Sequence, residues 1–323
     1  MRNMSFRILG TGSVVPDRSL SNNDLAGMVD TSDEWIVSRT GISSRRISSG
    51  ETMTDLCVKS SLLALENAEV SPDELDLIIC ATICGDYITP SQASLIQSEI
   101  GATCPAFDVN AACSGFIYAL DTASAYLSSG KASKILVVAY DSLSKFVDWT
   151  DRNTCVLFGD GGGAVVLDKG DDLLGINLTS EGNAEILNIP CHNESPFGSE
   201  TVTRQFLQMN GQEVFKFAVS RIVTEMKKLI QNCKVSADEI DYVLLHQANI
   251  RIINAARQRL GMPESKFMSN LARYGNTSAG SIPVLLDELN RNGTLRKGQI
   301  LALIAFGGGL TTGACLLRWD PAK

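Results

Sequence analysis

Residues 71–78 read SPDELDLI, and residues 236–243, which lie 165 positions later (236 − 71 = 165), read SADEIDYV. Each copy is a short acidic segment that leads into an apolar run typical of a buried strand. Matches that recur in order at one offset predict a duplicated structural unit. The further matches at this offset align residues 113–115 with 278–280 and residues 135–136 with 300–301.

The repeat also shows where the two halves differ. Residues 163–164 match residues 313–314 at an offset of 150 (313 − 163 = 150). The first half therefore carries roughly 15 additional residues, which we place in the polar and aromatic stretch 141–153. We expect one half to span residues 1–172 and the other to span residues 173–323, as two copies of one fold.

The pattern around the repeat is that of an α/β protein. Continuous apolar runs predict strands that are covered on both faces, and segments of helical periodicity lie between them. The predicted strands are 6–9, 77–79, 135–138, 164–167, 242–245, 300–304 and 314–317. The predicted helices are 52–68, 112–128, 211–233, 250–260 and 278–292.

Composition excludes several classes of protein. Of the 323 residues, 44% are hydrophobic and 20% are charged, which is ordinary for a globular chain and argues against disorder. No apolar run approaches the ~20 residues that cross a bilayer, and the N-terminus lacks the pattern of a secretory signal, so we expect a cytoplasmic protein. The net charge of −8 argues against a broad nucleic-acid or anionic-membrane surface, but allows a small basic patch for one acidic partner.

The cysteines and glycines do not indicate a metal or a bound cofactor. The nine cysteines are scattered without a C-x-x-C pair, which predicts reduced thiols in packing roles. Residues 10–12 and 159–164 are rich in glycine but fail as dinucleotide fingerprints, because the first is followed by Val15 and Pro16 and the second leads into a predicted strand. Residues 307–309 are better explained by close backbone approach, with an N–H that can hold an oxyanion.

Only two histidines are present, which limits the sites that can use one. His192 lies among prolines and polar residues, which predicts a surface loop. His246 directly follows the apolar run 243–245, at the carboxyl end of a predicted strand, where the catalytic groups of α/β folds gather. A structural and a catalytic role for His246 both stay open on this observation.

Cys113 lies where a predicted strand turns into a helix. The positive end of the helix dipole favours a thiolate there, and the backbone N–H groups can hold an oxyanion; a small packing residue is the alternative. Because the repeat aligns Cys113 with Ser278, the two helix starts should meet near the centre. Asn276 lies in a turn of the same kind, where helix capping is the alternative. We therefore predict that the thiol, the His246 imidazole and the Asn276 carboxamide share one cleft.

Five segments, taken in order, resemble one known family. They are residues 30–36 (DTSDEWI), 111–116 (AACSGF), 246–251 (HQANIR), 274–278 (YGNTS) and 305–309 (AFGGG). They resemble 3-oxoacyl-carrier-protein synthase III, the condensing enzyme that starts type II fatty acid synthesis, and the resemblance covers nearly the whole chain. It implies the thiolase fold, in which a duplicated βαβαβαββ unit is layered α-β-α-β-α, and it implies a homodimer.

The resemblance also implies an acyltransferase mechanism. Cys113 takes the acyl group from an acyl-CoA primer and holds it as a thioester. Malonyl on the acyl carrier protein then loses carbon dioxide, while His246 and Asn276 donate hydrogen bonds to the thioester oxygen as it becomes an enolate. The carbanion attacks the acyl group, whose oxyanion lies on the N–H groups of Cys113 and Gly308. The product is a 3-oxoacyl carrier protein.

Binding roles follow from the same resemblance. It places the CoA adenine between Trp35 and Arg152 through stacking and cation–π interaction. The other residues implied in binding CoA or its pantetheine arm are Thr31, Gly211 and Asn249. The residues implied in binding the acidic carrier protein are Gln247, Arg251, Lys216 and Arg259, and the positive charges of the last three locally offset the −8 of the chain.

Departures from the family pattern cluster where the primer should lie. Thr89 stands where acetyl-selective members have a Phe that closes the acyl pocket across the dimer. Thr312 stands in place of a common Trp, and Trp149 in place of a common Pro. Smaller side chains at two of these positions indicate a roomier pocket, so we expect a primer that is longer than acetyl or branched.

Other functions stay open at this point. The nearest is a relative in specialised metabolism that uses another primer or acceptor. A degradative thiolase is less favoured, because that class has a second cysteine as a base and the late Cys315 lies in a predicted strand. A non-catalytic partner of a condensing heterodimer is also less favoured, because such partners lose the nucleophile and this chain keeps Cys113.

Overall fold

The computed structural model describes residues 5–190 and 206–321, and its core is two five-stranded sheets. His192, which we expected in a surface loop, lies outside the described residues. The first sheet has the strand order β1 (Ser5–Val14), β7 (Asp160–Gly170), β6 (Lys134–Ser142), β4 (Leu77–Ala81) and β5 (Ala106–Val109). The second has the order β8 (Leu173–Thr179), β14 (Thr311–Arg318), β13 (Ile300–Gly307), β11 (Tyr242–Leu245) and β12 (Phe267–Met268).

The two sheets repeat the same pairing pattern. In the first, β4 is parallel to β5 and β6, whereas β7 is antiparallel to β6 and β1. In the second, β11 is parallel to β12 and β13, whereas β14 is antiparallel to β13 and β8. The duplication that the sequence repeat predicts is therefore present strand by strand.

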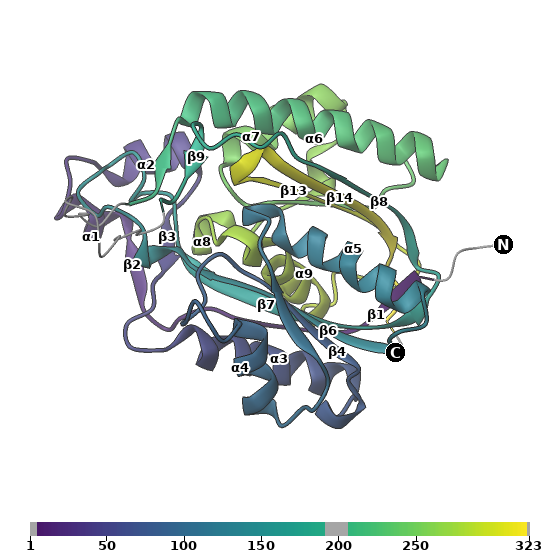
Figure 1. The fold of residues 1–323 in the computed structure, drawn as a ribbon. Helices are drawn as coiled ribbons and strands as arrows, with labels where there is room; N and C mark the ends of the chain where they lie inside the picture. Colours follow the sequence, from purple (N-terminus) through teal and green to yellow (C-terminus); the bar gives the residue numbers. More distant parts are fainter. Residues whose placement is uncertain (1–4, 191–205, 322–323) are drawn as a thin grey trace.

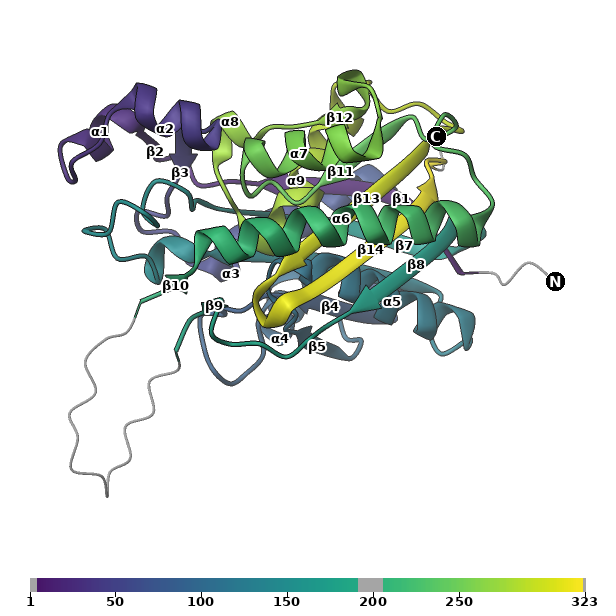
Figure 2. The same ribbon diagram turned by 90° about the horizontal axis from the view of Figure 1, so that it is seen from above.

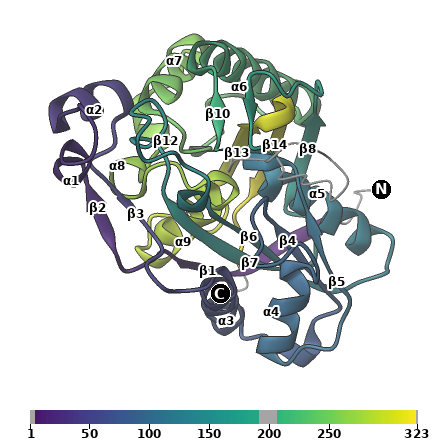
Figure 3. The same ribbon diagram turned by 60° about the vertical axis from the view of Figure 1, so that its left-hand side comes forward.

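Helices and sheets alternate in five layers (Figures 1 and 3). Between the sheets lie α5 (Gly115–Ser128) and α9 (Ser281–Arg291), and their apolar side chains form one cluster with residues of both sheets. The outer face of the first sheet is covered by α3 (Met53–Ala68) and α4 (Gln92–Ile100), and that of the second by α6 (Gly211–Cys233) and α7 (Ile250–Leu260). This is the α-β-α-β-α order that we expected.

The burial of each helix follows from its layer. The outer helix α6 buries one face, with Ala218, Ile222 and Met226 toward the sheet, whereas most residues of the central α9 are buried. The glycines of β1 are needed for close packing of α3. A Cβ at Gly10 would lie 2.4 Å from Ala68 N, which no side chain tolerates. These glycines therefore serve helix–sheet contact, in agreement with the failed dinucleotide fingerprint.

The repeat shifts by one residue inside the fold. Asn110 Oδ1 accepts the Ala112 N–H at 3.3 Å, and Asn276 Oδ1 accepts the Ser278 N–H at 2.9 Å, so these two turns are equivalent at an offset of 166 (276 − 110 = 166). The structural counterpart of Cys113 is consequently Ala279. The alignment of Cys113 with Ser278 is wrong by one residue, because the segment between β11 and α9 is one residue longer than its counterpart in the first half.

The segments that do not belong to the repeated sheets and helices lie together at one end of the molecule (Figure 2). The connection 143–159 joins β6 to β7, where the second half has only the short turn η6 (Gly308–Leu310), so the additional residues lie about where we placed them. This connection packs against the lobe 19–46 in a separate apolar cluster that includes Leu25, Ile36 and Leu207. The lobe holds β2 (Ser19–Ser21), α1 (Asn22–Ala26), α2 (Asp33–Thr40) and β3 (Ser44–Arg46).

The remaining elements are short. They are η1 (Pro72–Glu74), η2 (Ala112–Ser114), η3 (Leu143–Lys145), β9 (Leu187–Asn188), β10 (Gln208–Met209), η4 (Glu264–Lys266), α8 (Leu271–Tyr274) and η5 (Ser278–Gly280). Among the residues that the structure describes, no helix is long and apolar enough to cross a membrane.

Candidate active site

A cavity of about 1370 Å³ holds the thiol, the imidazole and the carboxamide that the sequence singled out. Cys113 lies in η2 at the start of the central helix α5, His246 directly follows β11, and Asn276 follows α8. All three therefore come from the junctions at which strands or short helices lead into the next helix. The other predicted site residues that line this cavity are Trp35, Gly211, Lys216, Asn249 and Arg251.

Cys113 is held where the two halves meet. Its Sγ lies 3.3 Å from the hydroxyl of Ser278, which comes from the equivalent turn of the second half. The end of β13 lies against the same turn, since a Cβ at Gly307 would be 2.6 Å from Cys113 N. The prediction that the two helix starts meet is thus confirmed, and the glycine segment 307–309 does serve close backbone approach.

The surroundings of Cys113 favour the neutral thiol. Burial raises the pKa of the thiol to about 12 against a hydrogen bond from Ser278, and the nearby Asp141 carboxylate raises it further. A rise of this size corresponds to about 4 kcal/mol against the thiolate. The N-terminus of α5 acts in the opposite direction and favours the thiolate.

His246 is buried and neutral. Desolvation lowers the pKa of the imidazole to about 3, so the ring carries no charge near neutral pH. Its Nδ1 lies 2.8 Å from Ser281 Oγ, and its ring packs edge-on against Phe306 with the ring centroids 5.1 Å apart. These contacts fix the plane of the imidazole and leave Nε2 for the cavity.

Asn276 is fixed through both its backbone and its side chain. Its N–H donates to Leu157 O at 2.9 Å, and its C=O accepts from Gly159 N at 3.0 Å. The side-chain Oδ1 accepts the Ser278 N–H at 2.9 Å. Because the oxygen is used in this turn, the Nδ2 donor is the group left for a ligand.

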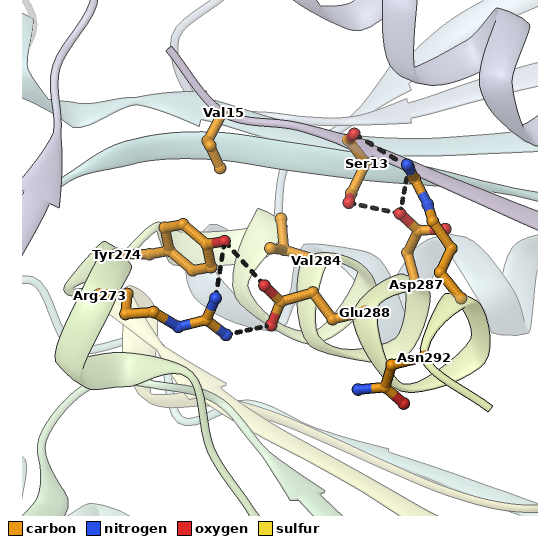
Figure 4. A pocket seen from close by; sticks show the side chains of 9 residues that line it. Ser13, Val15, Arg273, Tyr274, Val284, Asp287, Glu288 and Asn292 are labelled. Carbon is orange, nitrogen blue, oxygen red and sulfur yellow. Dashed lines mark hydrogen bonds and ion pairs between the residues drawn. The ribbon is translucent and has the colours of Figure 1, made fainter. Parts of the chain in front are cut away.

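A smaller hollow of about 490 Å³ shows how the segment before Asn276 is anchored (Figure 4). Tyr274 Oη donates to Glu288 Oε1 at 2.7 Å, and Arg273 forms an ion pair with Glu288 Oε2 at 2.9 Å. Glu288 lies on α9, so α8 is tied to the central helix. The hollow contains none of the three groups described above. The contacts around it hold the turn that carries Asn276.

The mouth of the large cavity carries an aromatic side chain that contacts two cations. The guanidinium carbons of Arg39 and Arg152 lie 5.1 and 4.6 Å from the centroid of the Trp35 ring. Arg152 also donates to Asp30 O at 2.7 Å. The predicted pair Trp35 and Arg152 is thus brought together, and Arg39 is an additional cation that the sequence reasoning missed, although it lies four residues after Trp35 on the same helix.

Three of the predicted basic and polar contacts lie on α6 and α7 beside this mouth. Arg251 is exposed, with its guanidinium carbon 5.9 Å from the Phe215 ring centroid, and Asn249 caps α7 by accepting the Arg251 N–H at 2.8 Å. Lys216 is exposed and forms an ion pair with Glu213 at 2.7 Å. Arg259 is exposed near the far end of α7. The basic surface is therefore sparse, and its two members at the cavity are Arg251 and Lys216.

Gln247 does not lie on that surface. It is 1% exposed; its Nε2 donates to Leu245 O at 2.6 Å, and its Oε1 accepts from Ser269 Oγ at 2.6 Å. Both ends of the amide are thus used inside the protein. The buried amide does not support the expected contact of Gln247 with a carrier protein, because a polar residue just after a strand end can turn inward to satisfy backbone groups.

Other predicted residues are not among those that line the cavity. Thr89 is exposed, in the loop between β4 and α4. Thr312 is fully buried in β14, and Trp149 donates from Nε1 to Ser144 O at 3.2 Å. Gly308 follows Gly307 at the start of η6, and the Thr31 hydroxyl is buried without a hydrogen-bond partner in the described structure. Within residues 5–190 and 206–321, no three His, Cys, Asp or Glu side chains are grouped to hold a metal ion.

Comparison with known proteins gives the same family from sequence and from structure. The family model "3-Oxoacyl-[acyl-carrier-protein (ACP)] synthase III" matches residues 107–182, and its C-terminal counterpart matches residues 230–319. The chain is 48% identical to beta-ketoacyl-[acyl-carrier-protein] synthase III of Clostridium acetobutylicum, over 98% of this chain and 99% of that protein. The same enzyme of Synechococcus is 48% identical, over 97% of this chain and 96% of the relative.

A solved structure agrees with these relatives. The crystal structure of 3-oxoacyl-[acyl-carrier-protein] synthase III from Aquifex aeolicus superposes with a TM-score of 0.90 at 44% identity, covering 97% of this chain and 99% of that one. Full-length identity of this level, together with one fold, leaves no doubt about kinship, and it agrees with the resemblance in the five sequence motifs. The chain belongs to the beta-ketoacyl-[acyl-carrier-protein] synthase III family.

Proposed function

We propose that this protein joins an acyl-CoA primer to malonyl-acyl carrier protein in a decarboxylating Claisen condensation, which gives a 3-oxoacyl carrier protein and initiates fatty acid synthesis. The observation that carries the proposal is the presence of Cys113, His246 and Asn276 in one cavity. A nucleophile and two neutral hydrogen-bond donors are what this acyl transfer requires.

Cys113 is proposed to hold the acyl group. Its thiol attacks the thioester carbonyl of the primer, and exchange between two thioesters is nearly balanced in free energy. The developing oxyanion is proposed to lie on the N–H groups of Cys113 and Gly308. The close contact of Gly307 with the Cys113 backbone supports this, because it brings the end of β13 beside the nucleophile.

His246 and Asn276 are proposed to bind the thioester oxygen of malonyl-acyl carrier protein. Loss of carbon dioxide leaves an enolate and needs no base, so neutral donors are sufficient. The lowered pKa of His246 keeps the imidazole neutral, and the Asn276 Oδ1 is already held by the Ser278 N–H. The groups that remain for the substrate are therefore His246 Nε2 and Asn276 Nδ2.

The cavity mouth is proposed to bind the two carriers. Arg152 already lies over the Trp35 ring. The CoA adenine is proposed to stack on this ring, either in the place of Arg152 or together with it. Gly211 and Asn249 line the path from there, and Thr31 lies close in sequence to Trp35. Arg251, Lys216 and Arg259 are proposed to attract the acidic carrier protein, and Arg251 and Lys216 are both exposed at the cavity. The family resemblance implies Arg251 as the main contact.

The face that carries Thr89 is proposed to be the interface of a homodimer. The neighbouring Tyr87 and Ile88 are large apolar side chains with 63% and 102% exposure, which is unusual unless another surface covers them. The adjacent β5 is an edge strand with free pairing capacity. In such a dimer Thr89 would border the partner's acyl pocket, and its small side chain supports a primer longer than acetyl or branched.

Two further proposals concern the organisation and location of the chain. We propose halves of residues 1–172 and 173–323 that share the one site, since the strands of the first sheet end at Gly170 and those of the second begin at Leu173. We also propose a cytoplasmic location, because a nucleophilic thiol such as Cys113 must stay reduced to work.

The experiment that tests this function separates the two half-reactions. Intact-mass measurement after incubation with acetyl-, isobutyryl- and octanoyl-CoA reports the acyl adduct, and carbon dioxide release from malonyl-acyl carrier protein reports decarboxylation. Cys113→Ala should abolish the adduct. His246→Ala and Asn276→Ala should keep the adduct but slow decarboxylation by about 10²-fold or more, as loss of an oxyanion donor does.

Two results would contradict the proposal. Equal loss of both half-reactions in all three variants would contradict the division of roles. A strong preference for acetyl-CoA over the two larger primers would contradict the roomier pocket.

A further inference from the structure

One buried cation has no part in the mechanism described so far. Arg45 lies in β3 and has 0% exposure. Its Nη1 donates to Asn22 Oδ1 at 2.8 Å and to Leu20 O at 3.3 Å, and its Nη2 donates to Val156 O at 2.8 Å. Among the residues that the structure describes, these acceptors are all neutral oxygens, and none is a carboxylate.

The guanidinium is charged despite its burial. Burial lowers the pKa of Arg45 to about 10, which still leaves the group protonated near neutral pH. A buried charge without a charged partner is costly, and an apolar side chain of similar size would avoid that cost. The presence of an arginine at this point therefore calls for a reason in what its nitrogens hold.

The guanidinium joins two segments that lie far apart in the sequence. One terminal nitrogen binds the lobe 19–46, through Leu20 and Asn22, and the other binds the connection 143–159, through Val156. A planar fork of five N–H donors can bind two segments at once, whereas the single ammonium of a lysine cannot reproduce that geometry. Arg45 is thus a bridge between the lobe and the connection.

The connection leads directly to Asn276. Leu157 O accepts the Asn276 N–H at 2.9 Å, and Gly159 N donates to Asn276 O at 3.0 Å. Leu157 immediately follows Val156, whose carbonyl accepts from Arg45. The backbone of Asn276 is therefore bound by the same short segment that the guanidinium fixes.

The aliphatic stem of Arg45 packs against the same backbone. A Cβ at Gly159 would lie 3.0 Å from Arg45 Cβ, and a Cβ at Gly275 would lie 3.3 Å from it. Gly275 directly precedes Asn276 and has φ = 65°, a conformation that favours glycine. The two glycines thus let both strands of the Asn276 contact approach the arginine closely.

Residues at the start of β3 also hold the helix before Asn276. Ser43 N donates to Ala272 O at 2.9 Å, and Ser44 Oγ donates to Arg273 O at 3.1 Å. Ala272 and Arg273 belong to α8, which ends just before the turn that carries the carboxamide. The segment around β3 therefore fixes the surroundings of Asn276 from two directions.

We propose that Arg45 is a positioning residue for the condensation: its guanidinium fixes segment 156–159 against the lobe 19–46 and thereby holds the Asn276 carboxamide where it meets the thioester oxygen. The proposal rests on the proposed function, because it concerns the contact with the enolate assigned there to Asn276. Cys113 is placed by the start of α5 and the end of β13, so its acylation should depend much less on Arg45.

The test uses the whole enzyme and measures the two half-reactions separately. Arg45→Lys keeps the charge and the aliphatic stem but loses the fork that binds both segments. Arg46→Lys is the matched control, because this neighbouring arginine of β3 donates to Asp17 O at 2.8 Å and not to the connection 143–159. Carbon dioxide release from malonyl-acyl carrier protein reports decarboxylation, and first-turnover CoA release at saturating acyl-CoA reports acylation.

We expect Arg45→Lys to slow decarboxylation about tenfold, because a small displacement of a group that binds the reacting atoms is costly. Acylation at saturating acyl-CoA should stay within about threefold of wild type. Arg46→Lys should leave both steps within about threefold. Decarboxylation at the wild-type rate in Arg45→Lys, or an equal slowing of both steps, would overturn the proposal.

A double variant separates positioning from general damage to the protein. If Arg45 acts through Asn276, adding Arg45→Lys to Asn276→Ala should slow decarboxylation by less than about threefold further, because the group that it positions is already absent. A further tenfold loss in the double variant would contradict a role through Asn276. If Asn276→Ala alone decarboxylates at the wild-type rate, the proposed function of Asn276 fails, whereas the other outcomes concern Arg45 alone.

A second variant keeps the proposal falsifiable if Arg45→Lys does not fold. Asn22→Ala retains the arginine but removes the oxygen that binds Nη1 at 2.8 Å. It should slow decarboxylation at least about threefold more than it slows acylation at saturating acyl-CoA. Equal effects of Asn22→Ala on the two steps would overturn the proposal.

Discussion

His246 Nδ1 and Ser281 Oγ lie 2.8 Å apart, and the same hydroxyl accepts the Gln247 N–H at 3.3 Å. This contact holds the Nδ1 edge of the imidazole inside the protein, so the Nε2 edge is the one left for the cavity. Ser281 is the first residue of the central helix α9, so the orientation of the imidazole is set by a residue 35 positions away in the sequence. Two predictions about His246 follow from this pair and from its burial.

The first concerns Ser281→Ala. This change should slow malonyl decarboxylation about tenfold, which is the cost of losing one well-placed hydrogen bond. Acylation of Cys113 should be unchanged, since it does not use His246. Carbon dioxide release and CoA release measure the two steps separately. Ser61→Ala is the matched control, because it removes a buried hydroxyl on α3 that bonds only locally to Cys57 O at 2.7 Å. A parallel decline of both steps would mean general damage instead.

The second concerns pH and stability. Burial lowers the pKa of His246 to about 3, against ~6.5 for a free imidazole. Between these values the unfolded chain binds a proton that the folded protein does not, so the contribution of His246 is fully present above about pH 6.5 and is lost as the pH falls toward 3. Relative to His246→Gln, the wild type should lose about 1.4 kcal/mol more per pH unit between about pH 6 and 4. Urea unfolding at several pH values measures this, and parallel curves for the two proteins would refute it.

A third prediction separates nucleotide binding from acyl transfer. Trp35→Ala should raise KM for acyl-CoA roughly tenfold, since a stacked cation–π contact is worth about 1–2 kcal/mol, and it should leave kcat nearly unchanged. The same variant assayed with an acyl-pantetheine, which lacks the adenine, should match the wild type. A loss of equal size with both primers would place Trp35 in the structure of the site rather than in adenine binding.

Much of the fold could be predicted because the signals were long and periodic. The helices 211–233 and 250–260 have the predicted bounds, since each has a strongly amphipathic sequence and an asparagine cap, Asn210 and Asn249. The repeat predicted two equivalent sheets. In contrast, β8 was missed because this edge strand is only partly buried and contains Gly175, so its sequence has no continuous apolar run.

The site was predictable only in part, for a related reason. Cys113, His246 and Asn276 lie at element boundaries that a sequence pattern can mark. Asp141 and Ser281 are single polar residues in segments that pack the centre, and what each contacts depends on how the two halves meet. Gln247 is the opposite case. Its position beside His246 suggested a surface contact, but its amide makes two hydrogen bonds inside the protein.

The last prediction tests how closely the end of β13 must approach the nucleophile. Gly307 has φ = −165°, an extended conformation open to any residue, so its requirement is for space. An alanine Cβ there would lie 2.6 Å from Cys113 N and 3.2 Å from Ala112 Cβ, and the turn that carries the thiol would have to move. Gly307→Ala should therefore slow acylation by about 10²-fold, the effect of a displaced oxyanion donor, as measured by first-turnover CoA release. Gly27→Ala is the control, because its nearest contact would be 3.3 Å, to Asp24 O in a surface turn. Acylation at the wild-type rate in Gly307→Ala would show that the end of β13 can move away from Cys113 without slowing the reaction. The backbone at this end would then not hold the oxyanion.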